Sequence, residues 1–241
     1  GARSAPSGLS HRTERMRKHH VEKRERDFQK INRFAVPAYL AANLLLAGVN
    51  AVQSLWYYAV LALCALLLPL ILSLFYRIIR RRRSYQLDLL VYLYVFLLYT
   101  LGIVMRLYSL TSYYDKLAHT LSGIVIALFG LLLFHLLSPE KTMERARFPL
   151  AAVFVMAVVT AVAGIWEIWE FIVSLIFHSD PQRVLTTGVA DTMIDMIVCV
   201  VGGAAFLPSL WMYMSRGKTF FLLGIFEAAC RLPDPKEISE K

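Results

Sequence analysis

Residues 149–177, PLAAVFVMAVVTAVAGIWEIWEFIVSLIF, form a run of 29 residues in which Glu167 and Glu170 are the only charged side chains. A helix needs roughly 20 apolar residues to cross the ~30 Å hydrocarbon core of a bilayer. This run is long enough to span a membrane, and it therefore decides the fold class. We expect an integral membrane protein rather than a soluble domain.

Four more apolar runs precede this one and another follows it, each close to or above the length of a transmembrane helix. Across the chain, 58% of the residues are hydrophobic and 18% are charged, a composition that excludes disordered, collagen-like and disulfide-scaffold proteins. The sequence thus predicts an all-α, polytopic integral membrane protein with six transmembrane helices. The six expected spans are residues 35–52, 55–79, 87–108, 113–137, 149–177 and 186–214.

The positive charge lies between the expected spans. The chain holds 26 Lys and Arg against 17 Asp and Glu, a formal net charge of +9. Because the basic residues cluster in the connections, they predict anionic lipid headgroups as partners and no nucleic acid. Basic connections alternate with nearly neutral ones, so the positive-inside rule places both termini in the cytoplasm. The basic connections are residues 17–33, 80–83, 141–147 and 216–218, and the neutral ones are residues 53–54, 109–112 and 178–185.

The segments outside the spans differ in character. The chain opens with small and polar residues that are typical of a linker added for expression, so Met16 is a candidate natural start. The late stretch TFFLLGIFEAAC is too short to cross a membrane and has basic flanks, which predicts a helix lying in the cytoplasmic interface. We expect a linker (1–15), a basic cytoplasmic arm (16–33), a six-helix membrane domain (34–214), an interfacial helix (215–232) and a disordered tail (233–241).

Charged residues in the last three spans, together with His119, lie near the ends that we expect to face outward. At a rise of ~1.5 Å per residue, all of them lie within about 15 Å of the outer membrane boundary. Charged groups inside a membrane are costly, and by default they indicate function. The inner half holds only Asp88, which we interpret as an ion-pair partner of the basic residues 80–83. The outward group comprises Asp115, His119, Glu167, Glu170, Asp191 and Asp195, with Arg106 and Lys116 as supporting positive charges.

The five outward acids and His119 form three pairs, one in each of the last three spans, with members three or four positions apart. Such spacing puts both members on one helix face. Lipid would not tolerate these pairs, so the three faces are expected to converge on a water-filled pocket that opens outward. Gly123 and Gly202 continue two of the faces and predict close helix packing beneath the pocket. Trp166 and Trp169 flank the glutamates and predict an aromatic wall.

An acidic pocket with one histidine supports three interpretations. The first is an enzyme that acts on a lipid or a lipid-linked envelope substrate, because these groups can bind a divalent cation or serve as general acid and base. All six paired residues are then candidate catalytic groups. The candidate ligands for a divalent metal ion, whose identity the sequence leaves open, are His119, Glu170, Asp191 and Asp195.

The second interpretation is a proton- or cation-coupled transporter, in which the acids form a relay or a cation site. No polar stripe continues through the inner half of the spans, so a path would have to be created by motion. The third is a structural or signalling membrane subunit. In that case Arg106, Lys116 and a protonated His119 balance the acids in a buried ion-pair network.

Three ordered motifs resemble a group of bacterial membrane proteins. They are DKLAHTLSG at residues 115–123, WEIWEF at residues 166–171 and DTMIDMIVCVVGG at residues 191–203. The first resembles the D-K-x-x-H motif of VanZ-like proteins, and the three together are similar to the YjdF-type inner-membrane family. Glu170 and Cys199 depart from the VanZ pattern and favour the YjdF-type branch. The resemblance implies a multi-pass protein of the bacterial cytoplasmic membrane with a role in the cell envelope.

Overall fold

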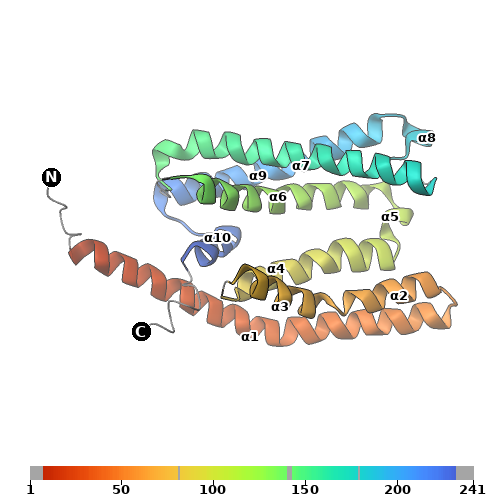
Figure 1. Ribbon diagram of the computed structural model, residues 1–241, viewed down its shortest axis with the longest axis horizontal. Coiled ribbons are helices and arrows are strands. Elements are labelled where there is room, and N and C mark those ends of the chain that lie inside the picture. Colours follow the sequence, from red (N-terminus) through yellow and green to blue (C-terminus); the bar gives the residue numbers. More distant parts are fainter. Residues whose placement is uncertain (1–7, 81, 140–142, 179, 232–241) are drawn as a thin grey trace. The chain divides into compact units, whose positions relative to one another are not determined.

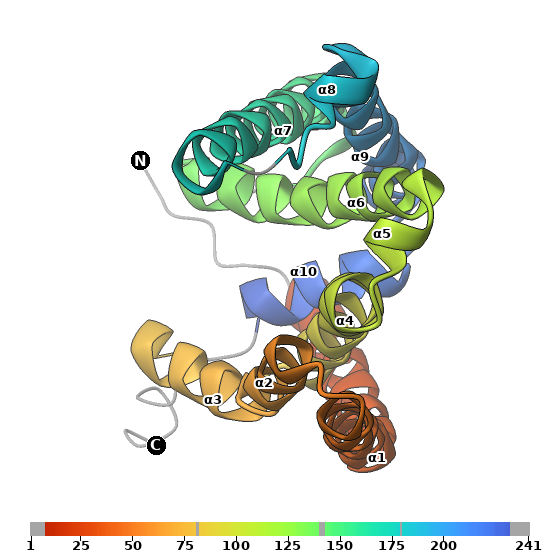
Figure 2. The same cartoon turned by 90° about the vertical axis from the view of Figure 1, so that its right-hand side faces the viewer.

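Helices make up nearly all of the computed structural model, which describes residues 8–80, 82–139, 143–178 and 180–231 (Figures 1 and 2). No strand occurs in those four ranges, so the predicted all-α class is confirmed. Five helices are long and apolar enough to cross a membrane, and a bent pair of shorter helices supplies a sixth span. The chain divides into two compact units: unit 1 is Gly1–Met105 with Glu227–Lys241, and unit 2 is Arg106–Phe226.

Unit 1 contains the first three expected spans. The 45-residue helix α1 (Gly8–Val52) runs without interruption from the basic arm into the first span, and it begins within the segment expected to be a linker. Helices α2 (Trp56–Ala65) and α3 (Leu68–Ile79) form the second span. Helix α4 (Tyr85–Val95) continues into the π-helix η1 (Phe96–Val104) and forms the third. Helix α1 packs against both α2 and α4.

The second span is broken, and the sequence explains the position of the break. Helices α2 and α3 meet at an angle of 41°. Pro69 lies in the first turn of α3 and has no N–H to donate to the carbonyl of Ala65, four residues earlier. The Tyr39 hydroxyl of α1 donates to that carbonyl instead, at 3.0 Å. A neighbouring helix thus satisfies the freed backbone group, as the membrane interior requires.

Two polar residues inside unit 1 satisfy each other. Asn43 of α1 and Thr100 of η1 are fully buried. Thr100 Oγ1 donates a hydrogen bond to Asn43 Oδ1 at 2.9 Å, and Asn43 Nδ2 donates to the Tyr39 carbonyl at 2.9 Å. Interhelical hydrogen bonds of this kind stabilise helix packing in membranes. The pair therefore joins α1 to the π-helix.

Acidic residues of unit 1 stabilise the start of α4. Asp88 forms an ion pair with Arg83, which confirms its interpretation as a partner of that basic run. Glu25 of α1 accepts hydrogen bonds from Ser84 Oγ at 2.9 Å and from Tyr85 N at 2.6 Å. A carboxylate at a helix N-terminus satisfies free N–H groups and interacts favourably with the helix dipole. The basic arm is thereby joined to the third span.

Unit 2 contains the last three expected spans, which are the helices α6 (Ser112–Leu137), α7 (Phe148–Phe177) and α9 (Ala190–Arg216). These helices pack pairwise against one another. Helices α6 and α9 run in one direction and α7 runs in the opposite direction (Figure 1). A short helix precedes each of them: α5 (Leu107–Leu110), η2 (Arg145–Arg147) and α8 (Val184–Thr187) respectively.

The last span begins later than expected. Helix α9 starts at Ala190 rather than at Thr186, because the residues before it form the separate turn α8. The Asp180 carboxylate caps that turn by accepting hydrogen bonds from Val184 N at 2.7 Å and from the following amide at 3.1 Å. Gly188 then adopts a φ of +61°, a conformation that favours glycine, and it separates α8 from α9.

Glycines bring α6 and α9 into backbone contact. A Cβ atom at Gly123 would lie 1.9 Å from the carbonyl oxygen of Cys199. A Cβ atom at Gly202 would lie 2.0 Å from the carbonyl oxygen of Thr120. Both distances are far inside van der Waals contact, so a residue without a side chain is required at each position. The predicted close packing at these two glycines is confirmed.

The helix expected after the last span is α10 (Phe221–Arg231). Its side chains Leu223, Ile225 and Phe226 are buried. In unit 2 the Phe226 ring contacts the His135 ring edge to face, with the ring centroids 5.4 Å apart. That this helix lies in the cytoplasmic interface stays a prediction.

Candidate functional site

The candidate residues gather at one end of unit 2. Helices α6 and α9 begin at that end and α7 finishes there, next to α5 and α8 (Figures 1 and 2). Asp115 and His119 occupy the first two turns of α6, and the aspartate pair occupies the first two turns of α9. Glu167 and Glu170 lie within the last three turns of α7. The alternation of helix directions thus places the three pairs at a common level.

Lys116 lies at the centre of the cluster. Its Nζ donates hydrogen bonds to Asp191 Oδ1 at 2.5 Å and to both carboxylate oxygens of Asp195 at 2.7 Å. Asp115 Oδ2 is 3.5 Å from the same nitrogen. Both predicted aspartate positions on α9 therefore meet one ammonium from α6, and Lys116 acts as the supporting charge that the sequence suggested.

His119 faces two carboxylates without forming a short hydrogen bond to either. Its Nε2 lies 3.7 Å from Asp115 Oδ1 and 3.9 Å from Asp195 Oδ1. One donor atom from each of these three residues lies within 4.8 Å of the other two. Because metal–ligand distances are about 2.0–2.6 Å, two ligands of one ion lie no more than about 5 Å apart. The three side chains can therefore share a cation.

The glutamate pair on α7 is placed differently. Glu167 is buried, and Gln182 Nε2 donates to its carbonyl at 3.0 Å and to its Oε2 at 3.1 Å. Glu170 is partly buried and accepts a hydrogen bond from Trp166 Nε1 at 3.0 Å. Neither carboxylate has a cationic partner within 4.0 Å in the part of the chain that the structure describes. The pair adds negative charge to the site but lies outside the compact donor group.

The expected metal ligands are therefore only partly brought together. His119 and Asp195 belong to the compact group, whereas Glu170 and Asp191 do not. Asp115, expected as a catalytic residue only, takes the third place. Asp191 instead contacts the cluster through Lys116, whose Nζ donates to its Oδ1 at 2.5 Å.

Arg183 and Gln182 are site residues that sequence reasoning missed. Arg183 Nε lies 3.9 Å from Asp191 Oδ2, and another nitrogen of the guanidinium donates to the Tyr108 carbonyl at 3.1 Å. The available signal was that Arg183 is the one basic residue of an otherwise neutral connection. Gln182 carried no signal, because a glutamine in a loop has no preferred partner. Local sequence pattern does not reveal contacts that depend on how a loop folds back.

Arg106 is the second supporting charge that the sequence suggested. It is exposed, precedes α5 and adopts a left-handed backbone conformation with a φ of +64°. The third span consequently ends at Val104, earlier than expected. Among the described residues, the cations within 4.0 Å of the site carboxylates are Lys116 and Arg183, together with His119 when protonated.

Negative charge exceeds positive charge at the site. Two fixed cations face the five carboxylates of the three helices. Asp191 Oδ2 and Glu167 Oε1 are buried, and neither accepts a hydrogen bond from the residues that the structure describes. A buried acceptor without a donor costs roughly 1–3 kcal/mol, and more when charged. The cluster therefore has capacity for a proton, a cation or water.

Backbone contact closes the site on its inner side. Gly123 lies one turn beyond His119 on α6, and Cys199 lies one turn beyond Asp195 on α9. At this level the backbones of the two helices are in contact, because a Cβ atom at Gly123 would lie 1.9 Å from the Cys199 carbonyl oxygen. The polar cluster thus ends abruptly in tightly packed small residues.

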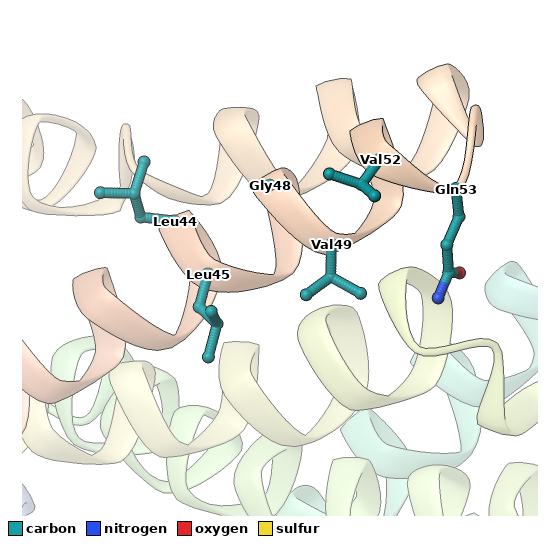
Figure 3. A pocket seen from close by; sticks show the side chains of 6 residues that line it. All are labelled: Leu44, Leu45, Gly48, Val49, Val52 and Gln53. Carbon is teal, nitrogen blue, oxygen red and sulfur yellow. The ribbon is translucent and has the colours of Figure 1, made fainter.

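A separate apolar groove lies along α1 in unit 1 (Figure 3). Its lining carries no ionisable side chain, and the space above Gly48 is open for at least 4 Å. Exposed apolar surface of this kind is ordinary on a transmembrane helix, where lipid covers it. The groove therefore contributes no chemistry to the site. It is lined by Leu44, Leu45, Gly48, Val49, Val52 and Gln53.

Comparison with protein families identifies a family that covers most of the chain. Residues 33–216 match the model of a family described as predicted membrane protein (DUF2238). The matched segment includes all six spans expected from the sequence and every candidate site residue. No curated protein and no solved structure matches the chain.

Proposed function

For this chain, which belongs to the DUF2238 family of predicted membrane proteins, we propose that unit 2 forms an outward-facing catalytic site in a bacterial cytoplasmic membrane. The site would act on a lipid or a lipid-linked envelope substrate, with a divalent cation held by Asp115, His119 and Asp195. This role agrees with the resemblance of the three motifs to VanZ-like and YjdF-type proteins.

The observation that carries the proposal is the convergence of three donor atoms from two helices to within 4.8 Å of one another. Two carboxylates and an imidazole are suitable ligands for a divalent transition metal. A cation held there would polarise a phosphoryl or carbonyl oxygen of the substrate. Asp191 and Glu167, with their buried unpaired oxygens, would add negative charge around it.

The surroundings suit an amphiphilic substrate. Trp166 and Trp169 are 52% and 56% exposed near the end of α7, and Trp166 Nε1 donates a hydrogen bond to Glu170. Indole rings favour the interfacial zone where lipid headgroups lie. A headgroup could therefore reach the carboxylates while its chains stay in the bilayer. Under the positive-inside rule this end of unit 2 faces outward.

A transporter is less well supported. Transport through unit 2 needs an inner pathway, and the backbone contact at Gly123 and Gly202 lies directly below the polar cluster. Opening it would require α6 and α9 to separate along their most closely packed segment. A site that opens to one side only fits binding and chemistry better than passage.

A structural role is the second candidate, and one observation favours it specifically. Lys116 forms three short hydrogen bonds that join α6 to α9. Such a network fixes the register of two helices even when no ligand binds. In that case the acids would serve folding alone.

Metal content and thermal stability of Asp195→Asn separate these two functions. The amide keeps the shape but removes a charged oxygen ligand, so a metal site predicts loss of bound metal by at least tenfold. Glu170→Gln is the matched control, because it removes a carboxylate of the same site that lies outside the donor group. It should retain metal. A wild-type protein without stoichiometric metal, whose melting temperature does not rise with Mg²⁺, Mn²⁺, Ca²⁺ or Zn²⁺, would leave only the structural role.

A further inference from the structure

The position of Lys116 has a consequence for how the site binds its cation. Asp195 is shared between two sets of contacts: its Oδ1 is 2.7 Å from Lys116 Nζ and 3.9 Å from Nε2 of His119, its neighbour in the donor group. A divalent cation on this oxygen would lie about 4–5 Å from the lysine ammonium, given a metal–oxygen distance of about 2.0–2.6 Å. Two positive charges at that distance repel strongly in a partly buried site.

The lysine can leave the cluster without a change in the backbone. Lys116 lies in the second turn of α6, about 6 Å along the axis from the helix start at Ser112. Its side chain is long and flexible and is already 19% exposed. Such side chains extend toward water at membrane boundaries. The ammonium can therefore move to the aqueous end of the helix when another cation takes its place.

The carboxylates retain binding capacity when the lysine is present. Asp191 is 5% exposed and binds Lys116 through Oδ1 alone, and its buried Oδ2 accepts no hydrogen bond from the described residues. Arg183 Nε lies 3.9 Å from that oxygen, which is beyond hydrogen-bonding distance. The ammonium thus satisfies the pair of aspartates incompletely.

We propose that Lys116 is an internal competitor for the cation site: its ammonium occupies Asp191 and Asp195 in the state seen here, and a divalent cation binds by displacing it. This inference rests on the proposed metal site and adds how that site is regulated. Without metal, the Lys116 ammonium joins α6 to the two aspartates of α9. When metal binds, the lysine side chain moves toward the outward end of unit 2.

Mn²⁺ binding to the full chain in detergent tests the exchange. Lys116→Met removes the competing charge and should raise Mn²⁺ affinity at least tenfold over wild type. Lys218→Met is the matched control, because it makes the same substitution at an exposed position just beyond α9, and its Mn²⁺ affinity should equal that of wild type. The melting temperature of Lys116→Met should also rise more on addition of Mn²⁺ than that of wild type.

Equal Mn²⁺ affinity in wild type and Lys116→Met would overturn the exchange and leave the proposed metal site intact. Absence of Mn²⁺ binding in both proteins would overturn both. If Lys116→Met fails to fold, labelling of wild type decides. In detergent, a water-soluble amine reagent should modify Lys116 several-fold faster at saturating Mn²⁺, with Lys218 as internal reference, and an unchanged rate would refute displacement.

Discussion

At the scale of single residues, side-chain length decides which groups meet. The sequence predicted that Asp191 and Asp195 share one helix face, and both carboxylates do contact the Lys116 ammonium. That Lys116 is their shared partner could not be predicted, because the long lysine side chain can extend in several directions from its backbone position. Arg106 and Arg183 show the same limit: their places depend on left-handed backbone conformations at φ of +64° and +51°.

One hydroxyl carries the clearest prediction at this scale. Tyr39→Phe removes the donor to the Ala65 carbonyl, which Pro69 has left without its usual N–H. An unsatisfied carbonyl inside a membrane is costly, so we expect a loss of about 1–3 kcal/mol in unfolding free energy. Tyr57→Phe is the control, because Tyr57 is 69% exposed in the neighbouring helix. Denaturant unfolding in micelles gives both values, and equal stability of the two variants would show that the hydroxyl is dispensable.

At the scale of elements, apolar run length predicted the six spans, and the helices agree with it. The interior of a span was less predictable. Pro69 marks the break between α2 and α3, but no proline marks the π-helix Phe96–Val104. The interruption before α9 required Asp180 to cap a turn that looked like the start of a hydrophobic span.

The contact between α6 and α9 gives the prediction for elements. Gly123→Ala would place a methyl carbon 1.9 Å from a backbone carbonyl oxygen, which cannot rotate away, so the two helices must move apart. We expect a loss of about 1–3 kcal/mol or more in stability. Gly164→Ala on α7 is the matched control, because its nearest outside atom would be 3.8 Å away, and a gain or loss within about 1 kcal/mol is expected. Thermal melts of both purified variants provide the comparison. Equal melting temperatures would mean that the helices are not in backbone contact.

At the scale of the whole molecule, charge distribution predicts orientation in the membrane. The alternation of basic and neutral connections assigns the connection before α9 to the outside and the segment after α9 to the cytoplasm. The same assignment makes the acidic cluster of unit 2 accessible from outside the cell. Orientation thus determines which substrates can reach it.

Cysteine accessibility tests this orientation in cells. In a background without Cys64, Cys199 and Cys230, Leu185→Cys should react with an impermeant maleimide in intact cells, since Leu185 is 88% exposed. Lys218→Cys should react only after the membrane is permeabilised. The reverse pattern would move the acidic site to the cytoplasmic side and exclude an extracytoplasmic substrate.

The most direct test of the central claim is an experimental structure of the wild-type protein prepared with Mn²⁺, with anomalous scattering used to locate the metal. We expect one peak at about 2.0–2.6 Å from the donor atoms of Asp115, His119 and Asp195, with the Lys116 ammonium moved away from Asp195. A map without a peak among these three residues, with Lys116 still bound to Asp191 and Asp195 at saturating Mn²⁺, would contradict the metal site and leave an ion-pair network that serves folding.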